Sequence, residues 1–445
     1  MTRQRFPFSL RLLPLMILAG TAASVQAQSL VDLYTAARGF DASYQSAKSQ
    51  FDATLAKAEQ AQAAILPTVG LTAGISQTNQ DVQLPVSRNY SYNSQSATIA
   101  ASQPLYRPAN LASYEQGKKQ VTLAQAQLSQ AEQDLIVRVS QAYFDVLAST
   151  DTLEFVKSQK AAVAEQLASA KRNFEVGTST ITDSREAQAR FDLVVAQQLA
   201  AENDLRVKSI ALDQLVGTTN ARPKPLNAPV ALSGIQPADA ERWVNDALTN
   251  HPGIKQLEVA LDVAVLETAK AQAGHKPTLD LTGSLTTSNT TNGSSTGTAD
   301  TRANVASVGL SFTLPLFAGY ATQNRIKETV ALEEKARTDL EATKRVVAQG
   351  TRTAYFGVES GLGQVKALEA AEASSQSALD ANKLGYQVGV RINIDVLNSQ
   401  SQLFDTKAKL AKARYDVLVG GLKLRQAAGT LKAEDLQPVN SQLAR

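Results

Sequence analysis

The sequence is notable first for what it lacks. It contains no cysteine, so the chain has no disulfide, thiolate metal ligand or thiol redox chemistry. Aromatic residues make up 5% of its 445 residues, which favours long, closely packed helices over a bulky globular core. An excess of one charge is also absent, with 44 Lys and Arg against 41 Asp and Glu. This balance provides no basic patch for nucleic acid, so we expect no nucleic-acid partner.

Signals for catalysis are equally scarce. The two histidines, His251 and His275, are far apart and have neither a metal-ligand spacing nor a neighbouring Gly-flanked nucleophile. The HExxH motif, the P-loop and the dinucleotide-binding fingerprint are all missing. We therefore expect no enzyme, with no catalytic residue, no metal and no cofactor, and we expect both histidines at the surface or at a junction.

The first 27 residues are typical of a secretory signal peptide. Arg3, Arg5 and Arg11 precede or open an apolar run over 12–23, and a small-residue cleavage site ends at Ala27. A membrane anchor is the alternative, but the run is shorter than the roughly 20 residues that a spanning helix needs. We predict cleavage after Ala27. Because the three arginines supply the whole surplus of positive charge, the mature chain is neutral, with 41 basic and 41 acidic residues.

An internal repeat sets the expected architecture. Landmarks of the first half return in the same order about 210 residues later, which indicates a duplication. The pairs are Ala61-Gln62-Ala63 with Ala271-Gln272-Ala273, Pro67 with Pro277, Pro104-Leu105-Tyr106 with Pro315-Leu316-Phe317, Ala142-Tyr143-Phe144 with Ala354-Tyr355-Phe356, and Phe174-Glu175-Val176-Gly177 with Tyr386-Gln387-Val388-Gly389.

The repeat and the prolines divide the chain into segments. We predict a first structural repeat over 28–217, a linker or equatorial segment over 218–238, a second repeat over 239–429 and a tail over 430–445. Each repeat should run helix, β-hairpin, long helix, shorter helix. Proline is absent from 109–222 and from 316–437, as very long helices require, whereas Pro223, Pro225, Pro229 and Pro237 cluster in the linker.

Four short runs alternate between apolar and polar residues, as half-buried strands do. Their apolar positions are Val69, Leu71, Ala73 and Ile75; Ala97, Ile99 and Ala101; Leu279, Leu281 and Leu285; and Val308, Leu310, Phe312 and Leu314. The polar stretch from Ser288 to Thr298 is expected to be an exposed loop. A sheet of a soluble domain would alternate in the same way. Export, a hydroxyl-rich face and long polar loops favour a transmembrane barrel instead.

Four strands cannot close a barrel, and lipid does not tolerate an open sheet edge. Closure must therefore come from other copies of the chain. Two copies would give eight strands, whose side chains nearly fill the interior, whereas three copies would give twelve and leave a passage. We therefore predict a homotrimer with a 12-stranded transmembrane β-barrel, to which each chain contributes four strands.

The segment over 110–173 is expected to be one helix about 95 Å long. Tyr114, Val121, Leu128, Leu135 and Ala142 are spaced by seven residues, and a heptad repeat makes a left-handed coiled coil. An ordinary helical bundle would explain the spacing equally well, but not the barrel strands at the ends of the same helices. The predicted fold class is thus a mixed membrane protein, a barrel continued by a long α-helical coiled-coil tunnel.

With these elements occurring twice, the mature chain resembles TolC-like outer-membrane efflux and type I secretion channels. The most distinctive stretches are Gly385-Tyr386-Gln387-Val388-Gly389 with Arg391, Ile394-Asp395-Val396-Leu397, Leu66-Pro67-Thr68-Val69 and Val308-Gly309-Leu310-Ser311-Phe312. The resemblance implies an outer membrane of a Gram-negative bacterium, a periplasmic tunnel, and as partners a periplasmic adaptor, an inner-membrane ABC or RND-type transporter and outer-membrane lipid.

The resemblance also implies roles for residues near the far ends of the tunnel helices. Tyr386 and Arg391 would bond to Thr182 and Asp183 and so lock the tunnel entrance closed. Asp395 would form a constricting acidic ring, whereas the second ring position holds Asn398, which predicts a weaker negative field. Gly177 and Gly389 would form the helix-turn tips that meet the adaptor.

A simpler interpretation exists for each of these residues. The residues near expected helix starts are Thr182, Asp183, Asn393 and Asp395, and short polar side chains at such places commonly cap free backbone donors. The two tip glycines, at 177 and 389, could simply permit the turn between two helices. Judged by residue type alone, helix capping is the commoner role of these polar residues.

The predicted function is a passive outer-membrane exit duct for small molecules, secreted proteins or both. No residue pattern here could couple energy to transport, so the inner-membrane transporter would supply it. The alternative from another class is a trimeric coiled-coil surface protein or adhesin with a small barrel anchor. Strands that recur within each half favour the channel, since an adhesin would carry a single terminal barrel segment.

Overall fold

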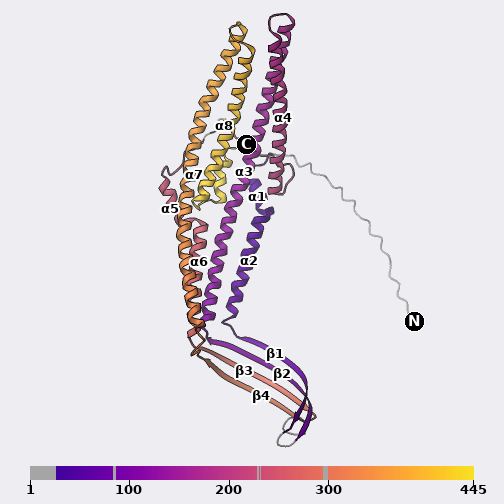
Figure 1. Cartoon of the computed structure of the whole chain (residues 1–445), viewed down its shortest axis with the longest axis vertical. Helices are drawn as coiled ribbons and strands as arrows, with labels where there is room; N and C mark the ends of the chain where they lie inside the picture. Colours follow the sequence, from indigo (N-terminus) through magenta and orange to yellow (C-terminus); the bar gives the residue numbers. More distant parts are fainter. Residues whose placement is uncertain (1–26, 84–86, 228–229, 231, 294–298, 445) are drawn as a thin grey trace, which may run out of the picture.

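The protein is elongated, with helices over most of its length and a four-stranded sheet at one end (Figure 1). This computed structural model describes residues 27–83, 87–227, 230, 232–293 and 299–444, so all but the last residue of the predicted signal peptide lies outside the described residues. The main elements are α1 Leu30–Phe40, α2 Ala42–Ala63, β1 Thr68–Val82, β2 Arg88–Tyr106, α3 Pro108–Glu175, α4 Ile181–Val216, α5 Ala240–Asn250, α6 Pro252–Gln272, β3 Thr278–Thr291, β4 Thr301–Thr313, α7 Ala321–Gln387, α8 Asn393–Ala427 and α9 Leu436–Asn440.

Each half opens with two helices rather than the one expected. Asp41 separates α1 from α2 and caps α2 by accepting a hydrogen bond from the Tyr44 amide at 2.8 Å. Pro252 is the first residue of α6 and follows directly after α5. Proline is favoured at this position because the backbone N–H that it lacks would have no partner within the helix. After these breaks both halves follow the predicted order of β-hairpin, long helix and shorter helix.

The two predicted hairpins lie side by side in one antiparallel sheet of order β1-β2-β3-β4. Pairing of β2 with β3 joins the two halves. The prediction of a loop over 288–298 was wrong for its first residues, because β3 continues to Thr291 and threonine suits a pleated surface. The part of this prediction over 294–298 lies outside the described residues. Pro104 lies within β2, beside an irregularity in the strand pairing between Pro104 and Tyr106.

The two faces of the sheet differ in chemistry on every strand. One face carries the predicted apolar side chains, and these are strongly exposed in the single chain, as at Ile75 (81%) and Val308 (84%). The other face carries rows of hydroxyls that bond across strands. These cross-strand pairs are Thr98 with Thr286 at 3.0 Å and Ser284 with Ser307 at 2.8 Å. An outward apolar face and a polar inner face are what a transmembrane barrel strand requires.

The long helices form two hairpins, α3 with α4 and α7 with α8, whose tips lie at the end of the molecule far from the sheet (Figure 1). The predicted helix over 110–173 is confirmed, because α3 has 68 residues and so extends about 100 Å. In the described part of the chain, no helix has a stretch long and apolar enough to cross a bilayer.

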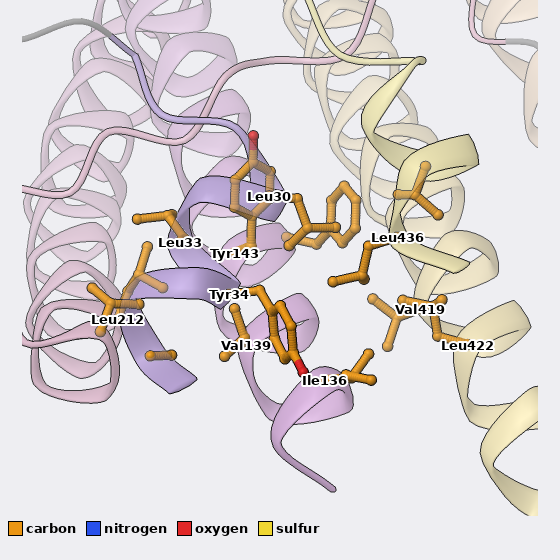
Figure 2. Close-up of a cluster of buried hydrophobic side chains, with 14 of the residues drawn as sticks. Leu30, Leu33, Tyr34, Ile136, Val139, Tyr143, Leu212, Val419, Leu422 and Leu436 are labelled. Atoms are coloured by element: carbon orange, nitrogen blue, oxygen red, sulfur yellow. The ribbon is translucent and has the colours of Figure 1, made fainter. Parts of the chain in front are cut away.

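The largest apolar core lies midway along the helices, where α1, α3, α4, α8 and α9 converge (Figure 2). Tyr143 and Phe144 of α3 are buried at its centre, and Phe144 stacks on Tyr415 of α8 with ring centroids 5.6 Å apart. The Tyr143 hydroxyl donates to the Lys224 carbonyl at 2.9 Å. The core thus ties the connecting segment and the C-terminal tail to the longest helices.

His251 occupies the junction between α5 and α6, and its Nδ1 accepts a hydrogen bond from the Gly253 amide at 3.1 Å. Burial lowers the pKa of this imidazole. His275 is exposed in the short turn after α6. The prediction that both histidines lie at a junction or at the surface is confirmed.

The cap at His251 predicts a pH-dependent stability. The folded state binds the proton more weakly than the unfolded state, so the free energy of unfolding should fall as pH decreases through the unfolded-state pKa of about 6.5. His251→Asn keeps a cap that does not titrate and should flatten this dependence, while His275→Asn should leave it intact. Urea unfolding of the mature protein at several pH values measures the effect, and equal slopes for wild type and His251→Asn would contradict it.

Candidate functional site at the helical tips

Both helical hairpins turn through a glycine in the left-handed region, with φ of 78° at Gly177 and 79° at Gly389. A Cβ added at either position would meet no atom within 4 Å, so the backbone conformation, and not space, selects glycine. The turns also share a backbone hydrogen bond, from Thr178 to the Asn173 carbonyl and from Val390 to the Gly385 carbonyl. This geometry satisfies the last carbonyls of α3 and α7.

Asp183 belongs to a capping box at the first tip. Thr180 is the N-cap of α4, and the Asp183 carboxylate accepts from the Thr180 amide at 3.0 Å and from the Thr180 and Ser179 hydroxyls at 2.9 Å. Burial alone would raise the pKa of Asp183, but these hydrogen bonds outweigh it and lower the pKa. Asp183 is therefore held as a carboxylate in a fixed orientation. Thr182, one residue earlier, is exposed.

The second tip is built differently, although it occupies the equivalent place. The N-cap of α8 is Ile392, which offers no side-chain acceptor. Asp395 lies in the first turn instead and pairs with Arg391, whose Nη1 is 3.6 Å from Asp395 Oδ2. Gly385 makes room for this arginine, because a Cβ there would lie 2.6 Å from the Arg391 Cγ. The capping interpretation thus holds for Asp183. It does not hold for Asp395, because the start of α8 has no side-chain capping hydrogen bond.

Two polar contacts link the tip region of one repeat to that of the other. Asn173 Nδ2 of α3 donates to the Tyr386 hydroxyl of α7 at 3.3 Å. Arg190 Nη2 of α4 donates to Asn398 Oδ1 of α8. Tyr386 and Asn398, both predicted site residues, are therefore positioned by the opposite repeat.

Within the single chain, the predicted lock residues are not all brought together. Arg391 meets Asp395 on its own hairpin, and Tyr386 meets Asn173, while the hydrogen bonds found for Asp183 come from its own turn. The bonds of Tyr386 and Arg391 to Thr182 and Asp183 stay a prediction for the assembled entrance.

The sequence analysis did not single out Arg190, and it named Gly385 only within a distinctive stretch and Asn393 only as a residue near a helix start. Asn393 is only 2% exposed, and among the described residues neither its Oδ1 nor its Nδ2 has a hydrogen-bond partner. Its counterpart in the first repeat is Ile181, so aligning the two repeats would have singled it out. No cluster of three or more His, Cys, Asp or Glu side chains able to hold a metal occurs in the part of the chain that the structure describes.

Comparison with known proteins agrees with this architecture. Residues 33–218 and 243–430 match the family described as Outer membrane efflux protein. The chain is 34% identical to Outer membrane protein TolC of Vibrio cholerae, over 97% of this chain and 98% of that protein. It is 30% identical to Alkaline protease secretion protein AprF of Pseudomonas aeruginosa, over 93% and 87%. The solved structure of VceC from Vibrio cholerae superimposes with a TM-score of 0.78 at 18% identity, covering 90% of this chain and 96% of that one.

The chain belongs to the outer membrane efflux protein family. It is a TolC-like channel subunit with four strands and a helical tunnel segment per chain, and its place is the outer membrane of a Gram-negative bacterium. Its function is that of an outer-membrane exit duct, and the adhesin alternative is not favoured. The resemblance drawn from the sequence is therefore confirmed.

Proposed function

We propose that three copies of this chain form a twelve-stranded barrel continued by a helical tunnel, through which cargo leaves the periplasm passively. The observation that carries the proposal is the sheet itself, which in the single chain has an exposed apolar face and two outer strands, β1 and β4, each with one unpaired edge. Lipid excludes such edges, so β1 of one copy must pair with β4 of the next.

The position of the apolar side chains along each strand supports a barrel with tilted strands. On β1 they run from Val69 to Ile75. On β4 they run from Ala306 to Phe312, because the strand ends at Thr313 and Leu314 of the expected run lies beyond it. The apolar run of β1 has its middle at residue 72, and the strand register pairs this residue across the sheet with residue 305 of β4. The apolar run of β4, however, has its middle at residue 309. The apolar band thus shifts by 309 minus 305, or four residues, across the sheet.

This shift gives a strand tilt. Four residues correspond to about 14 Å along a strand, and the three spacings between four strands also span about 14 Å, so a level band requires a tilt of about 45°. Transmembrane barrel strands tilt by about 35–45°. A half-buried sheet of a soluble domain has no reason to show this drift, so its size argues for a membrane barrel.

The partners follow from the same architecture. The relatives include an Outer membrane protein TolC and an Alkaline protease secretion protein, so we propose small molecules, secreted proteins or both as cargo. The cargo would arrive through a periplasmic adaptor bound at the tips around Gly177 and Gly389, from an inner-membrane ABC or RND-type transporter. The duct itself would be no enzyme and would need no cofactor.

The assembly is tested by the mass of the mature protein in mild detergent. We expect a stable trimer, because each chain provides only a third of the closed barrel. Sedimentation equilibrium with density matching of the detergent measures the mass of the protein alone. A folded, stable monomer at micromolar concentration would contradict both the trimer and the barrel.

The tips support a lock that can open at modest cost. The three hydrogen bonds to Asp183 from Thr180 and Ser179 all end on Oδ2, so that among the described residues Oδ1 is left to accept from another donor. The pairing of Arg391 with Asp395 is long and exposed, and such pairs contribute little. Arg391 can therefore leave Asp395 for Asp183 in the closed trimer, where Tyr386 would bond to the neighbouring Thr182.

Breaking this lock should raise the single-channel conductance in planar bilayers. We expect Arg391→Ser with Tyr386→Phe to shift the entrance towards its open state, because a charged hydrogen bond contributes about 1.5–3 kcal/mol and three copies act together. Lys383→Ser removes an exposed cation one turn from the tip and serves as the control. Unchanged conductance in a trimeric double variant would mean that these residues have only a structural role.

Asp395 is proposed as the ring that sets ion preference, because threefold symmetry would place three copies around one axis. Carboxylates that converge in a confined pore attract cations. We expect Asp395→Asn to lower the cation preference and Asn398→Asp to raise it, as read from reversal potentials across a salt gradient at low ionic strength. Asp380→Asn, on exposed α7 surface, is the matched control. Equal reversal potentials in all variants would reject the ring.

A further inference from the structure

The apolar face of the sheet ends in an arginine. Along β4 this face carries Phe312, Leu310, Val308 and Ala306, and two steps further it carries Arg302. Arg302 is exposed and lies in one row with Asn289 of β3, Gln95 of β2 and Ile75 of β1. If the proposed barrel is correct, this side chain points towards lipid and not into the passage.

The height of Arg302 follows from the strand tilt. It lies seven residues beyond the middle of the β4 apolar run at 309, which is about 24 Å along the strand and about 17 Å along the membrane normal at a tilt of about 45°. The apolar band of an outer-membrane barrel is about 25 Å tall, so its edge is about 12 Å from the middle. Arg302 is therefore at the level of the lipid headgroups, where an outward arginine has little energetic cost.

The surface beside Arg302 is hollowed and changes from apolar to polar. A hollow of about 640 Å³ is lined by Ala73 and Ile75 at one side and by Gln95, Asn289 and Arg302 at the other. Because the apolar band shifts across the sheet, Ile75 lies deeper in the membrane than Arg302 although they share a row. The hollow thus offers an apolar wall for an acyl chain below polar donors for a headgroup.

The charges near the hollow favour an anion. Among the described residues, none of the salt bridges involves Arg302. Asp300 lies just before β4, and its Oδ1 accepts a hydrogen bond from the Asn292 amide at 2.8 Å. A guanidinium binds phosphate through two parallel hydrogen bonds, and the amide groups of Asn289 and Gln95 can donate further ones.

We propose that Arg302, with Asn289 and Gln95, binds the phosphate group of an outer-leaflet lipid whose acyl chain lies against Ala73 and Ile75. The trimer would hold three such lipids. The site fixes the height and rotation of the barrel in the membrane, because it anchors the outer rim of the barrel to a phosphate. The opposite rim, where the barrel meets the helices, carries the exposed aromatic side chains of Phe317 and Tyr320. The inference rests on the proposed barrel.

Native mass spectrometry of the mature protein in detergent tests the site. The probes are lipid A, which carries two phosphates, and the same glycolipid with its phosphates removed. We expect wild type to bind the phosphorylated form at up to three copies per trimer. Arg302→Gln should weaken this binding about tenfold or more, since a charged hydrogen-bonded pair is lost, and Arg302→Lys should weaken it less.

Controls separate the possible causes. Arg345→Gln removes an exposed arginine of α7 and should leave lipid binding unchanged. Equal binding of lipid A to wild-type and Arg302→Gln trimers would overturn the proposal, as would equal binding of the dephosphorylated glycolipid. Inorganic phosphate that competes as tightly as lipid A would mean a free-anion site and reject the lipid. A wild-type spectrum without trimers would instead reject the barrel itself, so the two failures are distinguishable.

Discussion

The rest of this structure depends on one constraint, that lipid leaves no backbone hydrogen-bonding group unsatisfied. Each chain brings four strands whose outer two, β1 and β4, have free edges in the single chain. Helices satisfy their own backbones and can stand alone as rods, but the sheet cannot stand alone in a membrane. In the proposed trimer, assembly would therefore be a condition of folding for the sheet, whereas for the helices it would add only packing contacts.

The duplication helps to meet this constraint, because it doubles the number of strands that each chain brings. Each repeat supplies one hairpin, and the pairing of β2 with β3 joins them into one continuous sheet with the apolar side chains on the same face. Because the side-chain period of a strand is two, a slip by one residue would turn this face inward. The hydroxyl pairs of the opposite face, such as Thr98 with Thr286, follow the same register.

Much of the fold could be predicted from periodicity and prolines, because both act locally. Alternation indicated the four strands and the proline-free segments indicated the long helices. The breaks at Asp41 and Pro252 were missed, since a single residue decides each of them, a capping aspartate at the first and a helix-starting proline at the second. The extension of β3 through Ser288–Thr291 was missed because a run of Ser, Thr and Asn has the composition of a loop, whereas pairing with β2 and β4 determines its structure.

The candidate site was predictable in position but not in contacts. The paired glycines and Asp183 and Asp395 are visible in the repeat, and the turn geometry at both tips is the same to within a degree in φ. The partners are not visible, because they come from other helices. Asn398 meets Arg190 of α4, and Arg391 meets Asp395 only because Gly385 leaves room for it.

These contacts bear on the electrostatics of the proposed constriction. The two positions expected to carry the negative field each lie beside an arginine, Asp395 beside Arg391 and Asn398 beside Arg190. While Arg391 pairs with Asp395, the ring carboxylate is largely compensated; when Arg391 moves to Asp183, that carboxylate is released. Closing the lock would then strengthen the negative field at the ring, and opening it would weaken the field. If both proposed roles hold, ion preference and gate state would be coupled through the guanidinium of Arg391, and three symmetric copies would multiply this coupling.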